Sequence, residues 1–148
     1  MKSGSLLFCA VAVLGAAAAG ASAPTSVPGV ANPAQARVDY MLKCQGCHRP
    51  DGSGDAMSTP SMKGFVARFL HVQGGREFIA RVPGVASTDL SDARLADVLN
   101  WAIYRFDAEN VPADFRPYTP EEMGMLRQNP LRIERAETRA RLIVRIGD

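Results

Sequence analysis

Two cysteines and a histidine stand together in the run Cys44-Gln45-Gly46-Cys47-His48. The two thiols are about one helical turn apart, so both can reach one edge of a porphyrin. His48 follows directly, and its imidazole is a common ligand of iron. The spacing C-x-x-C-H is the signature of covalent haem attachment. We therefore expect one haem c, bound through Cys44 and Cys47, with His48 as the proximal iron ligand.

The same residues have two other interpretations, a zinc site and a thioredoxin-like redox pair. A zinc site needs about four nitrogen or sulfur ligands, and His71 is the only other histidine. A redox pair is expected within a βαβ unit, and no strand pattern surrounds the motif. The third cysteine, Cys9, lies in an apolar leader. Haem attachment is the interpretation that these residues favour.

Residues 1–23 have the pattern of a secretory signal peptide. Lys2 supplies the positive charge, and residues 6–19 form an apolar run. Ala21-Ser22-Ala23 matches an A-x-A cleavage site, with Ala19-Gly20-Ala21 as a close alternative. The apolar run is shorter than the ~20 residues that span a membrane, so an uncleaved anchor is the less favoured alternative. We expect an exported, periplasmic protein that contacts membrane only if the leader is retained.

The rest of the chain predicts one domain with an extension. The sequence has 148 residues and a formal net charge of +2, a balance that does not favour nucleic acid as a partner. Residues 24–31 are rich in Pro, Ser, Thr and Gly, which predicts a disordered lead-in. We expect the main domain over residues 32–106 and a helical extension over residues 107–148.

Helix signals occur along the whole domain. Asn32-Pro33 predicts an N-cap followed by the first residue of a helix that runs into Cys44. Its apolar stripe is expected at Val38, Met41 and Leu42. Short helices are expected over residues 65–70 and 77–82, the second ended by Pro83-Gly84. No alternating pattern predicts a strand, so the expected fold class is all-α.

Later helices have equally clear starts. Ser91 is expected to cap a long helix whose apolar positions run from Leu95 to Phe106. Thr119-Pro120-Glu121-Glu122 has the pattern of a capping box, and residues 131–146 predict a last helix. Six arginines and three acids lie between Arg127 and Asp148. We favour a solvated helix face for these charges, with a basic docking surface as the alternative.

In their order, four motifs resemble those of class I c-type cytochromes. They are Cys44–His48 after an opening helix, Asp51-Gly52-Ser53-Gly54 like D-G-x-G, Pro60-Ser61-Met62-Lys63-Gly64 like P-x-L-x-G, and Leu90-Ser91-Asp92 like L-S-D. The resemblance covers roughly residues 32 to 106. It implies a small all-α fold around one haem, and transfer of single electrons. It also implies that the Pro60 carbonyl accepts a hydrogen bond from the His48 ring.

One position departs from the family pattern. Many members have Met-Pro shortly before the L-S-D helix, where methionine is the distal iron ligand, and this chain has Val82-Pro83. Valine cannot bind iron, so another residue must supply the ligand or the site is open. Met62 is our candidate. The alternatives are His71, Met57, Met123 or Met125 in the extension, and no protein ligand.

These features predict an electron carrier rather than an enzyme. The expected donor is a periplasmic dehydrogenase or another cytochrome, and the expected acceptor is an oxidase or a further carrier. One alternative is a haem protein with an open distal site, for small-ligand binding or peroxidase-like chemistry. Another is a cytochrome subunit of a larger complex, which the extension over residues 107–148 suggests. We find no carboxylate pair or Ser/His/Asp arrangement that would indicate other catalysis.

Overall fold

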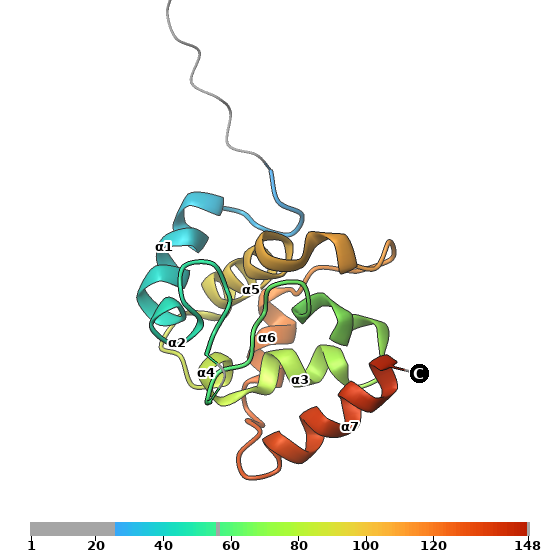
Figure 1. Ribbon diagram of the computed structural model, residues 1–148. Coiled ribbons are helices and arrows are strands. Elements are labelled where there is room, and N and C mark those ends of the chain that lie inside the picture. Colours follow the sequence, from blue (N-terminus) through green and yellow to red (C-terminus); the bar gives the residue numbers. More distant parts are fainter. Residues whose placement is uncertain (1–25, 56, 148) are drawn as a thin grey trace, which may run out of the picture.

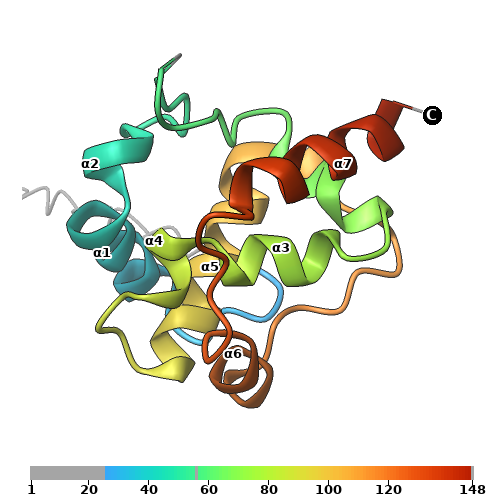
Figure 2. The ribbon, with the colours of Figure 1, turned by 90° about the horizontal axis from the view of Figure 1, so that it is seen from below.

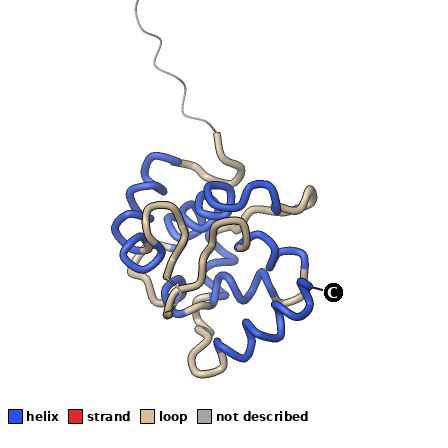
Figure 3. The backbone as a smooth tube through the Cα atoms, viewed as in Figure 1, coloured by secondary structure: helices blue, strands red, loops and turns tan. Residues whose placement is uncertain are grey.

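The computed structural model describes residues 26–55 and 57–147, and these residues fold into helices joined by loops (Figures 1 and 3). The expected signal peptide, residues 1–23, lies outside the described residues. The elements are α1 (Pro33–Lys43), α2 (Gln45–His48), η1 (Val66–His71), α3 (Gly75–Arg81), α4 (Pro83–Ala86), α5 (Asp92–Asp107), η2 (Ala108–Asn110), α6 (Pro120–Leu126) and α7 (Arg135–Gly147). Within the described ranges, the only β-type pairing is the isolated bridge between Asp55 and Thr59. The all-α prediction is confirmed.

Helices α1 and α5 begin where the sequence predicts. The Asn32 side chain accepts a hydrogen bond from the Gln35 backbone N–H at 3.0 Å, and Ser91 accepts one from Arg94 at 3.4 Å. The two helices pack together, with the Tyr40 ring centroid 5.1 Å from that of Phe106. This pairing anchors α1, and α1 delivers the chain into α2.

The predicted apolar stripe of α1 is wrong. Val38, Met41 and Leu42 are exposed, and the side of the helix that is buried carries Ala36, Asp39 and Tyr40. Asp39 is 1% exposed because its carboxylate pairs with the Arg94 guanidinium of α5, with an Nε–Oδ2 distance of 2.9 Å. A charged residue such as Asp39 counts as polar in a hydropathy pattern even when an ion pair buries it. The pattern therefore indicated that the opposite face of α1, with Val38, Met41 and Leu42, would be buried.

Residues 26–31 are a second correction, since the sequence predicted disorder over 24–31. The Ala31 and Asn32 N–H groups donate to the Asp97 carboxylate of α5 at 3.0 and 3.1 Å. Gly29 has φ of +69°, and a Cβ on it would lie 2.1 Å from Pro117 Cβ, so the position requires glycine. Contacts with residues far away in the sequence hold this segment in place. The local composition gives no sign of these contacts, so it predicted disorder.

The extension belongs to the same core as the rest of the domain. Its buried side chains are Tyr118, Met123, Leu131 and Leu142. The fully buried Asn100 of α5 donates to the Tyr118 carbonyl at 3.0 Å and accepts from the Tyr118 N–H at 2.9 Å. Helix α6 begins at Pro120, with Thr119 Oγ1 accepting from the Glu122 N–H as predicted.

Two arginines attach the extension further. Arg76 of α3 makes two hydrogen bonds of 2.6 Å to the Glu122 carboxylate of α6. Arg127 donates to the Leu90 carbonyl and the Asp92 carboxylate at 2.8 and 2.9 Å, and also to the carbonyls of Thr88 and Ala86. These bonds hold the loop between α4 and α5. Pro83 ends α3 as predicted, and it also begins α4.

Helix α7 completes one side of the molecule. It packs against η1 and α3, far from them in sequence (Figure 2). It begins at Arg135, four residues later than the predicted start, because residues 131–134 pass the end of α3, where the Leu131 N–H donates to the Arg81 carbonyl at 2.8 Å. No helix in the described ranges is both long and apolar enough to cross a membrane.

Candidate haem attachment site

Helix α2 brings the two thiols and the imidazole together. Cys44 ends α1 and precedes α2, and the N–H groups of Cys47 and His48 donate to its carbonyl at 3.2 and 2.9 Å. This single turn places Cys44 and Cys47 one turn apart, with His48 next to Cys47. Both thiols are free; Cys44 is half-buried and Cys47 is exposed. Burial raises the pKa of Cys44 to about 11.

His48 has the environment of a neutral imidazole. Burial lowers its pKa, because a charged ring loses hydration there. Its Nδ1 atom is buried and has no hydrogen-bond partner in the structure. The expected bond to the Pro60 carbonyl is therefore not formed. The Pro60 oxygen instead faces Gly54, where an added Cβ would lie 2.9 Å from it.

The donor set fits haem c. Two free thiols one turn apart match the two vinyl positions that haem attachment uses, and a neutral imidazole is the form that binds iron. An iron-bound histidine carries its proton on the other ring nitrogen, which usually donates to a carbonyl or water. In His48, Nδ1 is the ring nitrogen that would carry this proton if Nε2 bound the iron, and it has no hydrogen-bond partner in the structure. The residues present would hold the group, and the sequence assignment of these three residues stays a prediction.

A glycine-rich loop follows α2 and closes back on it. The Gly54 N–H donates to the His48 carbonyl at 3.1 Å, and the Met62 N–H donates to the Gly52 carbonyl at 2.8 Å. Gly54 has φ of +62°, and a Cβ on it would lie 2.1 Å from the Thr59 carbonyl oxygen. The second glycine of the D-G-x-G pattern is therefore required by the backbone. The chain passes so close to Gly54 that no residue with a side chain fits there.

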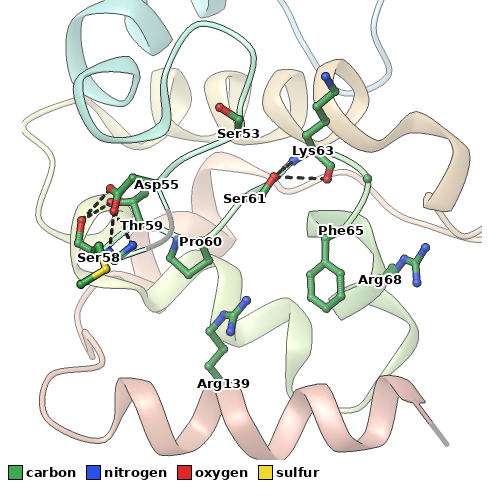
Figure 4. Close-up of a pocket in the computed structure, with 12 residues that line it drawn as sticks. Ser53, Asp55, Ser58, Thr59, Pro60, Ser61, Lys63, Phe65, Arg68 and Arg139 are labelled. Carbon is green, nitrogen blue, oxygen red and sulfur yellow. Dashed lines mark hydrogen bonds between the residues drawn. The ribbon is translucent and has the colours of Figure 1, made fainter.

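A cavity of about 760 Å³ lies beside this loop (Figure 4). It is lined by residues of the loop and of η1, together with Arg139 of α7. Its size is within the usual range for ligand pockets. Arg139 is a lining residue that the sequence did not indicate. The only sequence feature that could have indicated Arg139 is its position three residues before Leu142, which is buried. Residues three apart lie on the same face of a helix.

The candidate distal ligands lie in different surroundings. Met62 is partly buried against the core, on the segment bonded to Gly52, and remains the candidate. Met57 lines the cavity and is 95% exposed. His71 is exposed, with Nε2 2.8 Å from the Asn110 carbonyl oxygen. Met123 is fully buried in the core, while its neighbour Met125 is exposed.

Comparison with curated proteins identifies two relatives, both named cytochrome c-552 and both from Thermus thermophilus. Each is 33% identical over 108 residues, which cover 60% of this chain and 82% or 72% of the relative. The chain belongs to the c-type cytochromes. No family model matches it, and no solved structure matches it.

Membership of this family confirms the resemblance seen in the sequence, and the class I assignment is consistent with it. The family consists of electron-transfer proteins, which agrees with the prediction that the chain is not an enzyme. The alignment covers 60% of the chain, whereas the domain expected from the motifs, residues 32–106, makes up about half of it. This cytochrome therefore resembles its relatives over more than the four motifs.

Proposed function

We propose that this cytochrome is an exported carrier of single electrons with one covalently bound haem c. The observation that carries the proposal is α2, where two free thiols and the neutral His48 occupy one helical turn. When bound, the haem supplies an iron centre that alternates between two oxidation states. Cys44 and Cys47 retain the group, and His48 holds the iron from one side.

The surrounding structure suits electron transfer. Aromatic rings of α1 and α5 form a compact cluster behind the attachment helix, with centroids of Tyr40, Trp101 and Phe106 within 5.8 Å of their neighbours. Close packing of this kind resists deformation. A rigid surround changes little when the charge on iron changes, so the barrier to electron transfer stays low.

Location and partners complete the proposal. The leader pattern of residues 1–23 supports export to the periplasm. The proposed donor is a periplasmic dehydrogenase or a cytochrome, and the proposed acceptor is an oxidase or a further carrier. Carriers of this kind bind their partners briefly and through small interfaces.

The test is the intact mass of protein made in a host that attaches haem c, measured under denaturing conditions. We expect the mature chain plus one haem, and a start of the chain near Ala21 to Ala23. The variants Cys44→Ala and Cys47→Ala should each lose one thioether bond and change the reduced absorption band. Unmodified polypeptide in the wild type would contradict the proposal. Retention of both thioether signals in the cysteine variants would contradict the assigned residues.

A second function has one specific observation in its favour. Val82 stands where many family members have the methionine ligand, and it packs against the core. If no other residue binds the iron, carbon monoxide should bind the ferrous protein at once, which favours an open site. If Met62 binds, the wild type should resist carbon monoxide and show a sulfur-to-iron band, and Met62→Leu should lose both properties. His71→Gln is the matched test for the histidine alternative.

A further inference from the structure

Arg49, the residue after His48, has a backbone conformation that residues other than glycine rarely adopt. Its φ is +62° and its ψ is 166°, a region that is essentially restricted to glycine. In the described ranges, every other residue with a positive φ is a glycine. A strained conformation of this kind persists only where the surrounding structure imposes it. The groups that hold Arg49 therefore act directly beside the predicted iron ligand.

The Tyr40 hydroxyl is the side-chain group that holds Arg49. It donates a hydrogen bond to the Arg49 carbonyl at 2.6 Å. Two main-chain bonds act with it, since the Arg49 N–H donates to the Gln45 carbonyl at 2.8 Å and the Gly52 N–H donates to the Arg49 carbonyl at 3.3 Å. The bond of 3.3 Å is longer than usual. The hydroxyl is therefore the closer of the two donors to this carbonyl.

Tyr40 is itself firmly held in the core. Its side chain is 2% exposed, and the centre of its ring lies 5.4 Å from that of Trp101 and 5.1 Å from that of Phe106. Phe106 also contacts the glycine-rich loop, because a Cβ on Gly52 would lie 2.7 Å from its ring. The packing of α1 against α5 therefore sets the place of the hydroxyl that holds Arg49.

The conformation of Arg49 matters for His48, because the ring has no other hydrogen bond on its Nδ1 side. The His48 N–H donates to the Cys44 carbonyl at 2.9 Å, and its carbonyl accepts from the Gly54 N–H at 3.1 Å. Nδ1 is buried without a hydrogen-bond partner among the described residues. In most metal sites a partner of that nitrogen orients the ring. Here the backbone on either side of His48 has to provide the orientation.

We propose that Tyr40 is a positioning residue, which orients the His48 imidazole by holding Arg49 in its left-handed conformation. The inference rests on the proposed function, in which this imidazole binds the iron. In this role Tyr40 acts through the main chain and makes no bond to the iron. Without the hydroxyl, Arg49 relaxes to a negative φ. The chain then leaves His48 in a different direction, and the ring turns with it.

The experiment compares Tyr40→Phe with Tyr118→Phe in the ferric holoprotein. Each variant keeps the ring and loses one hydroxyl of a buried tyrosine, and neither changes a charge. The lost bonds are alike, since the two hydroxyls donate to the main-chain carbonyls of Arg49 at 2.6 Å and of Arg76 at 2.8 Å. The NMR shifts of the haem methyl groups report the orientation of the imidazole on the iron. Spectra are recorded well below the melting temperature of both variants.

Amide hydrogen exchange is a second measurement, and it follows the loop without reference to the haem. Tyr40→Phe should change the pattern of the methyl shifts and speed the exchange of the Gly52 and Gly54 N–H groups at least tenfold. Tyr118→Phe should leave both measurements as in the wild type. Methyl shifts in Tyr40→Phe that equal those of Tyr118→Phe would overturn the proposal.

A rescue experiment tests whether Arg49 is the link between Tyr40 and His48. Glycine adopts a positive φ without strain, and alanine does not. In the Tyr40→Phe background, Arg49→Gly should restore most of the wild-type methyl shifts, and Arg49→Ala should not. Both substitutions remove the same charge, so a difference between them comes from the backbone. Equal spectra of the two double variants would overturn the proposal.

The measurements also separate this role from the proposed function. If the purified protein contains no covalent haem, the proposed function fails, and the role of Tyr40 toward the iron fails with it. Amide exchange then tests the hold on Arg49 by itself. Faster exchange in Tyr40→Phe than in Tyr118→Phe would support that hold, and equal rates would exclude it.

Discussion

Replacing Asn100 with alanine tests whether the extension is part of the domain's folding unit. Asn100 is fully buried and makes three hydrogen bonds. Its Nδ2 donates to the Gly29 and Tyr118 carbonyls at 2.9 and 3.0 Å, and its Oδ1 accepts from the Tyr118 N–H at 2.9 Å. One side chain thus joins residues before α1 and after η2 to helix α5.

The cost follows from the groups that lose their partner. Gly29 is exposed, so water can replace the bond to its carbonyl. The Tyr118 N–H and carbonyl are in a buried part of the core, and each unpaired buried group costs about 1–3 kcal/mol. We expect Asn100→Ala to lower the free energy of unfolding by roughly 2–6 kcal/mol.

The assay is equilibrium unfolding in guanidinium chloride, followed by Trp101 fluorescence and by helical circular dichroism. The wild type should show one transition by both probes, because the extension and α5 share a core. Gly84→Ala is a control for expression and handling, since nothing lies within 4 Å of an added Cβ there. A loss below about 1 kcal/mol in Asn100→Ala, or separate transitions in the wild type, would show that the extension is not part of the same folding unit as α5.

Three further predictions concern other parts of the structure. Arg94→Met should lower the free energy of unfolding in urea, because it leaves the buried Asp39 carboxylate without its cation; the double variant Asp39→Leu, Arg94→Met should recover most of the loss, and no recovery would argue against pairing. Gly54→Ala should cost at least about 2 kcal/mol in thermal unfolding, since its Cβ would meet the Thr59 oxygen; a loss as small as that of Gly84→Ala would show that the loop can relax. Hydrogen bonds from Ser58 and from the Met57 N–H lower the pKa of Asp55 to about 2 from 3.8, so its contribution is present above pH 3.8 and is lost as pH falls through about 2. Asp55→Asn should therefore flatten the acid side of the stability profile, and parallel profiles would contradict this.

Local signals predicted much of the fold. Asn32, Ser91 and Thr119 cap their helices as expected, because a cap depends on residues three positions away. The C-x-x-C-H turn is likewise local, and α2 places its thiols one turn apart as the spacing required.

The errors have a different origin. The buried side of α1 depends on an ion pair between Asp39 and Arg94, which are 55 positions apart. Order in residues 26–31 depends on Asp97 and Asn100. The cavity role of Arg139 depends on how α7 packs against α3 and η1. All of these contacts join residues that are far apart in the sequence. A local sequence pattern contains no information on such contacts, so a single sequence could not predict them.

A potentiometric titration of the purified protein, read at the haem absorption bands, tests directly whether this cytochrome carries single electrons. We expect one reversible transition that fits a one-electron Nernst curve, with the same bands before and after a full cycle. A protein without haem bands, or a transition that does not reverse, would show that it is not a carrier of single electrons on haem c.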